Sequence, residues 1–500
     1  MRILYRCCAA LDVHKKTVCA CIRRAGGKAE VERATFGTYT DDLERLGEWL
    51  RERQVKRVAM ESTGVYWIPV WNVLEQSRFR LELLLVNPAL VKALPGQKTD
   101  PKDAGRIAEL HQYGLLRGSF IPPPPVRQLR DLVRSRVHVQ QDRNRIVNRI
   151  GRLLESANLK LGSVASNIVG QSGRRMLYAI AEGERRPAQL ASLALGRLQQ
   201  KEAELARALQ GRFTDHLRWL LRDLLEDLHH AETRLEQMER AIRSHLLPHA
   251  AAVERLRTIP GVDEVTAWAI VSEIGWDMSV FPSADHLASW AGLCPGNDES
   301  AGKRRSGRTR KGNRYLRRSL VQNAWAVAHA KESFLSALFL RLARRRGVKK
   351  AALAVAHRIL VIAYYILRDD VAYRELGSGY YDRLHPLRTQ RRLVERLQGL
   401  GYEVDLRPKA GVETAPSCAA DAPVPRRPGR PAGPAKRAYP KRRQPTCAKC
   451  AERGIVCFHR QAPPSRPAAA QTSGCAKCAR WGIACIHLRP RPGTISPPSQ

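Results

Sequence analysis

Hydrophobic and polar positions along the first 120 residues alternate in a way that predicts strands and helices in turn. We expect CCAALDVH and KTVCACIRR to form a hairpin, and VERATFGT to form a third strand. Helical spacing follows in DDLERLGEWLRERQ, short buried strands in RVAMEST and RLELLLVN, and a last helix in DPKDAGRIAELHQYG. The order of three strands, a helix, a strand, a helix, a strand and a helix predicts an α/β layer fold.

The run IPPPPV at 121–126 interrupts this pattern, and long helical stretches follow it. Residues 127–158 and 187–246 are charged and rich in leucine, with apolar residues at intervals of three and four in LQQKEAELARAL and LRDLLEDLHHAETRLEQMERAI. This spacing predicts long antiparallel helices or a coiled coil. An ordinary helical bundle without a partner has the same apolar stripes and remains the alternative.

A second globular unit, mainly α-helical, is expected from about 251 to 375. LRTIPGVDEVTAWAIVSEIG predicts a helix, a tight Pro-Gly turn and a helix, and FPSADHLASWAGLCP predicts another helix and turn. Such a helical hairpin presents backbone N–H groups to a phosphate, or it serves packing alone. From about 405 the chain is dominated by Pro, Ala, Arg and Lys, which predicts a disordered basic tail. The expected regions of the chain are an α/β domain at 1–120, a helical or coiled-coil linker at 121–250 and the second globular unit at 251–375. A helical end with a Pro/Arg-rich linker at 376–445 and a cysteine-containing segment at 446–490 follow.

The charge of the chain narrows the class of partner. Lys and Arg number 86 against 47 Asp and Glu, a formal net charge of +39. This excess favours DNA or RNA as the partner over a basic protein without a polyanion. No uninterrupted apolar run reaches the roughly 18 residues of a membrane span, and the N-terminus does not resemble a secretory signal. We therefore expect a cytoplasmic, nucleoid-associated protein without a membrane partner, whose 12 cysteines are core residues or metal ligands rather than disulfides.

Four acidic residues in the first unit are candidates for a metal site. Asp12 lies within the first predicted strand and Glu61 at the end of the fourth, and a carboxylate buried in a strand is costly unless paired or bound to a metal. Asp100 and Asp103 are spaced to share one face of a helix, although first-turn acids also simply favour the helix dipole. If the four converge, Mg²⁺ offsets their repulsion and supports phosphodiester transfer.

A basic segment, GNDESAGKRRSGRTRKGNRYLRRSL, follows the second pair of predicted helices. Interspersed glycines predict a flexible loop that follows a nucleic-acid backbone, with a solvated loop as the alternative. Ser300 opens this loop and is a candidate nucleophile next to cations; Ser306 is its rival, and a loop serine that only forms hydrogen bonds fits equally well. The candidate nucleic-acid contacts are Lys303, Arg304, Arg305, Arg308, Arg310, Lys311 and Arg314, followed by Arg317 and Arg318.

These segments together resemble the transposases of the insertion sequence 110 family. LDVHKK at 11–16, MESTGVYW at 60–67 and VNPALVKALPGQKTDPKDAGRIAEL at 86–110 are similar to its DEDD domain, whose fold is RuvC-like, of the ribonuclease H type. IPGV, ASWAGLCP and SAGKRRSGRTRKGNRYLRRSL resemble its second domain. The resemblance implies that Asp12, Glu61, Asp100 and Asp103 are the metal-binding acids.

The second domain of that family has a nucleophilic serine before a Gly-Lys pair, and Ser300 matches it. Glu299 immediately before it departs from the usual context. The resemblance further implies recombination directed by a guide (bridge) RNA, in a homo-oligomer, a dimer or tetramer, whose subunits share a site. Two alternatives are a RuvC-like nuclease that uses water as nucleophile, and a non-catalytic nucleic-acid-binding protein. Retention of all four acids and the serine disfavours the latter.

The tail has a repeat that lies outside this family pattern. CAKCAERGIVCFH and CAKCARWGIACIH share the spacing C-x-x-C, six residues, C-x-H. Three thiolates and one imidazole make a tetrahedral zinc set, so two zinc knuckles are predicted, with unmetallated cysteines as the alternative. The ligands are Cys447, Cys450, Cys457 and His459 in the first copy and Cys475, Cys478, Cys485 and His487 in the second.

Overall fold

The fold is taken from a computed structural model, and contacts divide the chain into two units, Met1–Val404 and Asp405–Gln500. Backbone positions are described for residues 3–25, 30–62, 64–88, 100–296, 298–300, 303–330, 332–384 and 386–406. Within these ranges, side chains are not described for 100–103, 298–300 and 303–305. The predicted zinc ligands of the tail lie outside the described residues.

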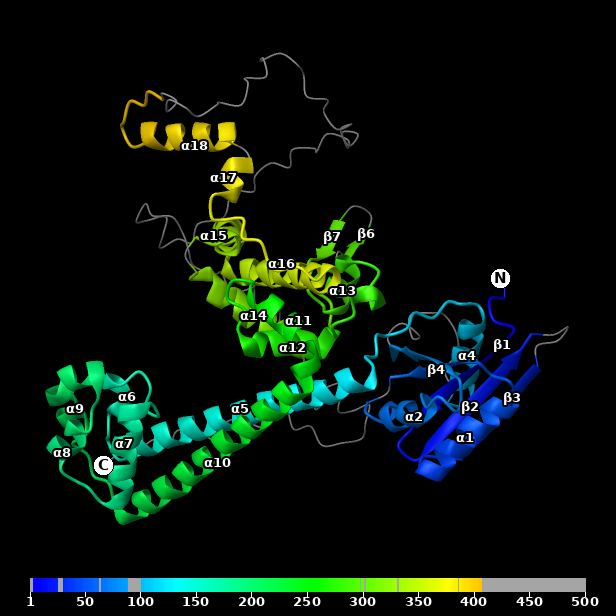
Figure 1. Cartoon of the computed structure of the whole chain (residues 1–500), viewed down its shortest axis with the longest axis horizontal. Helices are drawn as coiled ribbons and strands as arrows, with labels where there is room; N and C mark the ends of the chain where they lie inside the picture. Colours follow the sequence, from blue (N-terminus) through cyan, green and yellow to red (C-terminus); the bar gives the residue numbers. More distant parts are fainter. Residues whose placement is uncertain are drawn as a thin grey trace, which may run out of the picture. The chain divides into compact units, whose positions relative to one another are not determined.

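The first part of the chain folds as a mixed five-stranded sheet in the order β3-β2-β1-β4-β5 (Figure 1). Its strands are β1 Cys7–Val13, β2 Thr17–Arg24, β3 Glu30–Gly37, β4 Arg57–Glu61 and β5 Glu82–Val86. The strands β1, β2 and β3 pair antiparallel, whereas β4 is parallel to both β1 and β5. The predicted strands and their order along the chain are confirmed.

Helices cover both faces of this sheet. On one face, α1 (Thr40–Glu52) and α2 (Trp67–Leu74) bury their leucines against β1 and β4 residues such as Leu11 and Met60. On the other, α4 (Asp100–Gln112) packs its Ala104, Ile107 and Ala108 against a floor of small side chains on the central strands: Ala10, Cys21 and Ala59. The small residues let the helix approach the sheet closely. Consecutive strand residues therefore serve opposite cores, as the period of two requires.

Two long antiparallel helices follow, α5 (Pro124–Ser156) and α10 (Asp215–Leu246), side by side in Figure 1. Arg136 of α5 pairs with Glu239 of α10, and Arg143 pairs with Glu232, so residue numbers rise along one helix as they fall along the other. Helix α5 begins inside the proline run, with Pro124 in its first turn, where the missing N–H has no partner to lose. The predicted antiparallel pairing is confirmed.

The expectation of one helical stretch over 187–246 is wrong in its first half. Short elements lie between the long helices: α6 Leu161–Val164, α7 Gln171–Glu182, α8 Pro187–Ser192, η1 Gly196–Lys201 and α9 Glu202–Ala208. The chain crosses the end of α5 after α9, since Arg212 N donates to Ala157 O at 3.1 Å. A Cβ at Gly211 would lie 2.5 Å from the same carbonyl oxygen, so only glycine fits this crossing. Helix α10 then starts at Asp215, where the Thr214 hydroxyl accepts from Leu217 N.

A third core is helical. Its elements are α11 Ala250–Arg257, α12 Glu264–Ile274, α13 Ala284–Trp290, α14 Arg314–Ala328, α15 Phe334–Arg346 and α16 Val348–Asp369, with α17 Tyr380–Leu384 and α18 Pro386–Gln398 after them and η2 Leu247–His249 and η3 Met278–Val280 as short 3₁₀ turns. Helix α16 contacts α11, α13, α14 and α15. By length and composition α16 is apolar enough to cross a membrane, but one face of it, from Ala351 to Leu367, is buried in this core. Packing thus accounts for its apolar character.

A buried carboxylate joins α5, α12 and α14. Glu273 of α12 is 1% exposed, and both its oxygens accept from Arg134, at 2.7 and 2.8 Å. Arg130 lies 3.1 Å from the same carboxylate and donates to the Ser272 and Glu273 carbonyls. Asn313, the N-cap of α14, donates to Glu273 Oε2 at 2.5 Å. Burial lowers the pKa of Arg130 to about 10, which leaves it charged at neutral pH.

Replacing Glu273 with Ala is expected to lower the free energy of unfolding by about 3–5 kcal/mol, because Arg130 and Arg134 would then be buried without an anion. Urea unfolding of the full chain, followed by tryptophan fluorescence, measures this loss. Glu264→Ala is the matched control: it breaks the half-exposed pair of Glu264 with Arg243 and is expected to cost less than about 1 kcal/mol. Equal losses in the two variants would contradict the role given to burial.

Candidate functional site

The register of the sheet places Asp12 next to Glu61. Leu11 of β1 pairs with Met60 of the parallel strand β4, so the next positions along both strands are Asp12 and Glu61. Two residues earlier, Ala10 and Ala59 face α4. Because side chains alternate along a strand, Asp12 and Glu61 lie on that same face, at the carboxyl ends of neighbouring strands. The backbone register therefore places these two acids on neighbouring strands, and their role as metal ligands stays a prediction.

Asp12 is a buried carboxylate with a nearby imidazole. It is 8% exposed, and its Oδ2 lies 3.1 Å from His14 Nε2. On the same face, Cys8 Sγ donates to Ala108 O of α4, and burial raises the pKa of Cys8 to about 12. Burial also raises the pKa of Cys21. These thiols stay neutral at physiological pH, so they serve as small core residues, and the carboxylates are the groups with the charge to hold a cation.

The second pair of acids lies on the helix that covers this face. Helix α4 begins at Asp100 and includes Asp103, and it contacts β1, β2 and β4. The side chains of Asp100 and Asp103 lie outside the described part, as do residues 89–99. The described residues contain no group of three or more His, Cys, Asp and Glu that could hold a metal. Two hard oxygen donors side by side nevertheless fit Mg²⁺, and the meeting of all four remains a prediction.

The basic segment predicted to be a flexible loop is instead a β-hairpin. Its strands are β6 (Asp298–Ser300) and β7 (Lys303–Ser306), and Ser300 pairs with Lys303 in the antiparallel register. The strands are two residues apart in sequence, a spacing typical of tight hairpins. Of the described glycines, Gly296 and Gly312 lie where two backbone segments approach closely. The side chains of Ser300, Lys303, Arg304 and Arg305 are outside the described part.

The two serine candidates differ in what the structure describes. Ser306 is half-buried, and its hydroxyl oxygen accepts a hydrogen bond from Arg308 N at 3.2 Å, so it stabilises the turn that follows β7. For Ser300, the backbone places it last in β6, opposite Lys303. Its role as nucleophile remains a prediction.

Three glycines lie at the base of the hairpin. Gly296 N donates to Arg308 O at 2.8 Å, and the backbones of Gly292 and Gly312 cross in contact. A Cβ on Gly312 would lie 2.4 Å from Gly292 N, and Gly292 itself has a positive φ of +72°. Both positions therefore require glycine. Asn313, the next residue, caps α14 and donates to Glu273, so the hairpin is fixed to the buried carboxylate.

The described cations around the hairpin face solvent. Arg308, Arg310, Lys311, Arg314 and Arg318 are exposed, and Arg317 is half-buried with its guanidinium 3.4 Å from Gly292 O. Within the described part, no salt bridge neutralises Arg308, Arg310 or Lys311. An uncompensated cationic surface of this kind suits the phosphates of a nucleic acid.

An aromatic contact next to the hairpin escaped the sequence analysis. Arg134 of α5 lies 4.5 Å over the ring of Tyr315, and His138 is within 3.0 Å of the Tyr315 hydroxyl. Helix α5 and the residues after the hairpin are far apart in sequence, and no local motif indicates that they are in contact. The only signal was a tyrosine within a run of cations, and it does not identify its partner.

The predicted helical hairpin at 256–275 is confirmed as α11, a turn and α12, and its contacts favour the packing interpretation. Asp263 caps α12 by accepting from Thr266 N at 2.8 Å, which places a carboxylate at the helix N-terminus. Asn323 donates to the carbonyl of Gly261 in the turn, and a Cβ on Gly261 would lie 2.6 Å from Val327. One side of the turn thus packs on α14, and the Asp263 carboxylate occupies the helix N-terminus at which a phosphate would bind.

Comparison with known proteins identifies two matched regions. A family model for the DEDD-type IS110 transposase matches residues 9–159, and the model described as "Transposase IS116/IS110/IS902 family" matches residues 253–338. The first covers Asp12, Glu61, Asp100 and Asp103, and the second covers Ser300.

Several relatives carry consistent descriptions. A "Probable family 20 transposase" of Pseudomonas aeruginosa is 27% identical over 339 residues, 66% of this chain and 89% of that protein. The "Insertion element IS116 uncharacterized 44.8 kDa protein" of Streptomyces clavuligerus is 28% identical over 55% of this chain and 72% of its own length. A "Pilin gene-inverting protein" of Moraxella bovis is 32% identical over 25% of this chain and 38% of its own length.

Gly312→Ala is expected to lower the thermal midpoint and to expose the hairpin to proteolysis, because the new methyl group overlaps backbone atoms that cannot move independently. Gly151→Ala is the matched control. Gly151 lies inside α5, and a Cβ there would meet only Ile168 Cδ1, at an ordinary contact distance of 3.7 Å. This variant should therefore be as stable as the parent or more stable. Limited trypsin digestion with mass mapping of cuts between 303 and 318 distinguishes the two. If trypsin cut Gly312→Ala no faster than the parent, the close backbone contact between Gly292 and Gly312 would be contradicted.

Proposed function

The chain belongs to the IS116/IS110/IS902 family of transposases, and we propose that it cleaves and transfers DNA strands with metal-binding carboxylates and the nucleophile Ser300. The observation that carries the proposal is the placement of Asp12 beside Glu61, on the face of the sheet that α4 covers. Neighbouring carboxylates on one face repel each other, and a bound cation would offset that repulsion.

The sheet topology supports a ribonuclease H-like, RuvC-like fold for the sheet domain. Three antiparallel strands followed by two parallel ones, with β1 in the centre, give the acids neighbouring positions at one edge. In this proposal Asp12, Glu61, Asp100 and Asp103 hold Mg²⁺. When bound, the metal supplies a positive charge that stabilises the oxygens of a phosphodiester under attack. Asp12 and Glu61 fix its position from rigid strands, and Asp100 and Asp103 come from the start of α4.

In the proposed reaction the hydroxyl of Ser300 attacks a DNA phosphorus. A bond forms between Ser300 Oγ and phosphorus, the bond to one sugar oxygen breaks, and the serine proton ends on that leaving oxygen. The product is a phosphoserine link that a second sugar hydroxyl reverses, so no ATP is needed for rejoining. In this proposal, cations that follow the hairpin, including Arg308 and Arg310, stabilise the charged phosphoryl group.

Other parts of the function stay proposals. We propose a guide RNA and a homo-oligomer, a dimer or tetramer, in which the acids of one subunit act with the serine of another. Both zinc knuckles remain predictions about residues outside the described part. The net charge of +39 supports a nucleic-acid partner but does not distinguish DNA from RNA. The rival function is a nuclease that uses water in place of Ser300.

Asp12→Asn and Glu61→Gln are expected to lower strand cleavage by about 100-fold or more, because each removes a charged ligand that supports several kcal/mol of metal stabilisation. Both changes are nearly isosteric, so thermal unfolding should be close to that of the parent. Asp41→Asn, an exposed residue on α1, is the control for loss of one acid. Cleavage of a supercoiled plasmid carrying element ends in Mg²⁺ is the measurement. Parent-like cleavage by either site variant would refute the acidic site.

Ser300→Ala is expected to keep DNA binding and to lose both cleavage and the covalent adduct, because no other group then supplies the attacking oxygen. The adduct is detected as a protein–DNA band that survives denaturation, and its site is mapped by mass spectrometry. Ser306→Ala is the matched control and should retain the adduct.

Three results would change this assignment. An adduct that persists in Ser300→Ala and vanishes in Ser306→Ala moves the role to Ser306. Parent-like cleavage without an adduct in either variant identifies the water-using nuclease. No recovery of activity in a mixture of Ser300→Ala and Asp12→Asn chains argues against a site shared between subunits.

A further inference from the structure

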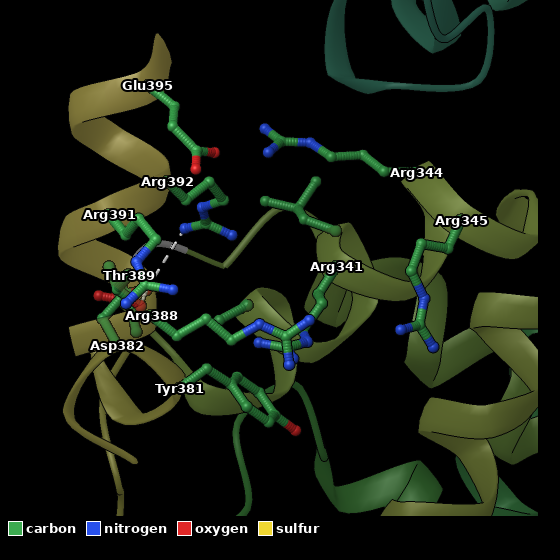
Figure 2. A pocket seen from close by; sticks show the side chains of 13 residues that line it. Arg341, Arg344, Arg345, Tyr381, Asp382, Arg388, Thr389, Arg391, Arg392 and Glu395 are labelled. Atoms are coloured by element: carbon green, nitrogen blue, oxygen red, sulfur yellow. Dashed lines mark hydrogen bonds and ion pairs between the residues drawn. The ribbon is translucent and has the colours of Figure 1, made fainter. Parts of the chain in front are cut away.

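An arginine-lined cleft lies between α15 and the segment that contains α17 and α18. Its volume is about 700 Å³ (Figure 2). The arginines in it begin at Arg341, and so follow the second family match, which ends at residue 338. No part of the proposed reaction uses this cleft.

Six guanidinium groups line the cleft, three from each side. The arginines of α15 and those of α18 both follow the spacing i, i+3 and i+4, which puts three side chains on one helix face. Figure 2 shows Arg341 and Arg344 on one wall and Arg388 and Arg392 on the other, extending toward the space between. The six are Arg341, Arg344, Arg345, Arg388, Arg391 and Arg392.

The acids nearby do not neutralise this charge. Asp382 and Glu395 also line the cleft, and Asp382 lies 3.7 Å from Arg392, with Thr389 donating to it at 3.2 Å. Among the described residues, no salt bridge involves Arg344, Arg388 or Arg391. All three are exposed. Like charges on facing helices repel each other, and the arrangement is favourable only with an anion that spans both walls.

The aromatic floor of the cleft indicates which part of a nucleic acid it meets. Arg341 lies 4.7 Å over the ring of Tyr381, and Tyr381 stacks on Phe334 with centroids 5.6 Å apart. The tyrosine is thus held by contacts within the protein and is not an open platform for a base. What the cleft offers is guanidinium groups, whose planar donor pairs match phosphate oxygens.

We propose that this cleft binds the phosphate backbone of duplex DNA, as a second contact region separate from the basic hairpin. DNA is chosen because the family to which the chain belongs is a transposase family, and in this respect the inference rests on the assigned function. Helices α15 and α18 place arginines along both sides of the cleft, so a DNA backbone that lies in the cleft would meet cations on either side. Binding here depends on charge and not on sequence.

The test is the salt dependence of DNA binding by the full chain, measured without divalent cations so that no strand is cut. Arg344→Gln/Arg388→Gln/Arg391→Gln removes three exposed guanidinium groups. Each phosphate contact contributes about 0.9 to the slope of log K against log salt, so the slope should fall by about 2–3. A 30-base-pair DNA duplex of arbitrary sequence and an RNA duplex of the same length are the two probes.

The matched control is Arg175→Gln/Arg207→Gln/Arg234→Gln, which removes the same charge from exposed positions dispersed over α7, α9 and α10. Its DNA slope should stay within about 0.5 of the parent if general charge is not the cause. Substituting Lys for the three cleft arginines should retain most of the slope. Arg391→Gln alone should lower it by about 0.9, and it covers the case in which the triple variant is unstable.

Four outcomes would overturn the proposal. The DNA slope could stay unchanged in the Gln triple variant of the cleft, or it could fall equally in the control variant. The fall could instead be confined to the RNA duplex, or the Lys variant could lose as much DNA slope as the Gln variant. Failure of the acidic-site variants to affect cleavage would leave these binding results untouched. The two ideas therefore fail separately.

Discussion

The buried carboxylate of Glu273 is the constraint on which the arrangement around the basic hairpin depends. It is 1% exposed, yet it is met by Arg130, Arg134 and Asn313 from two other helices. A charge at such a position is tolerable only when each lone pair has a donor, so the three partners are held to one geometry. Through Asn313 that geometry reaches the start of α14 and, one residue earlier, the glycine crossing at Gly312. The buried ion pair in the core thus helps to position the hairpin, together with the glycine contacts at the base of the hairpin.

The same helix that meets Glu273 also contacts the sheet domain. Arg127 of α5 pairs with Glu75, which follows α2, and Arg130 and Arg134 come within the next two turns. A helix rises about 1.5 Å per residue, so these three arginines span about 10 Å of one rigid element. The start of α5 thereby contacts both the sheet domain, which has the candidate acids, and the third core, which has the hairpin with Ser300. This is a physical reason for the density of arginines at the start of α5, which the sequence alone presents as an ordinary charged helix.

Local patterns predicted the sheet well, and the contacts between distant segments poorly. The apolar run CCAALDVH identified a strand with Asp12 inside it, whereas the parallel register of this strand with RVAMEST comes from the structure. Glu273, by contrast, stands in a helix of apolar residues, and its partner Arg134 is 139 residues away. Nothing in the spacing of either residue identifies the other. The glycines around the hairpin suggested flexibility, whereas Gly292 and Gly312 are required because two backbones touch.

Burial and exposure separate the two kinds of charge in this protein. In the sheet domain, thiols such as Cys8 and Cys21 are held neutral by burial, and small side chains bring α4 close, while Asp12 and Glu61 lie at the carboxyl ends of two neighbouring strands on that face. Around the third core the described arginines are exposed instead, both Arg308 and Arg310, which follow the hairpin, and the cleft arginines of α15 and α18. A cation suits the first environment and a polyanion the second. A DNA strand carries negative charge along its whole backbone, so in the proposed reaction one strand would suit both environments. Protein groups that meet the strand away from the reacting phosphate would then set its position, while the proposed metal site would act on one bond.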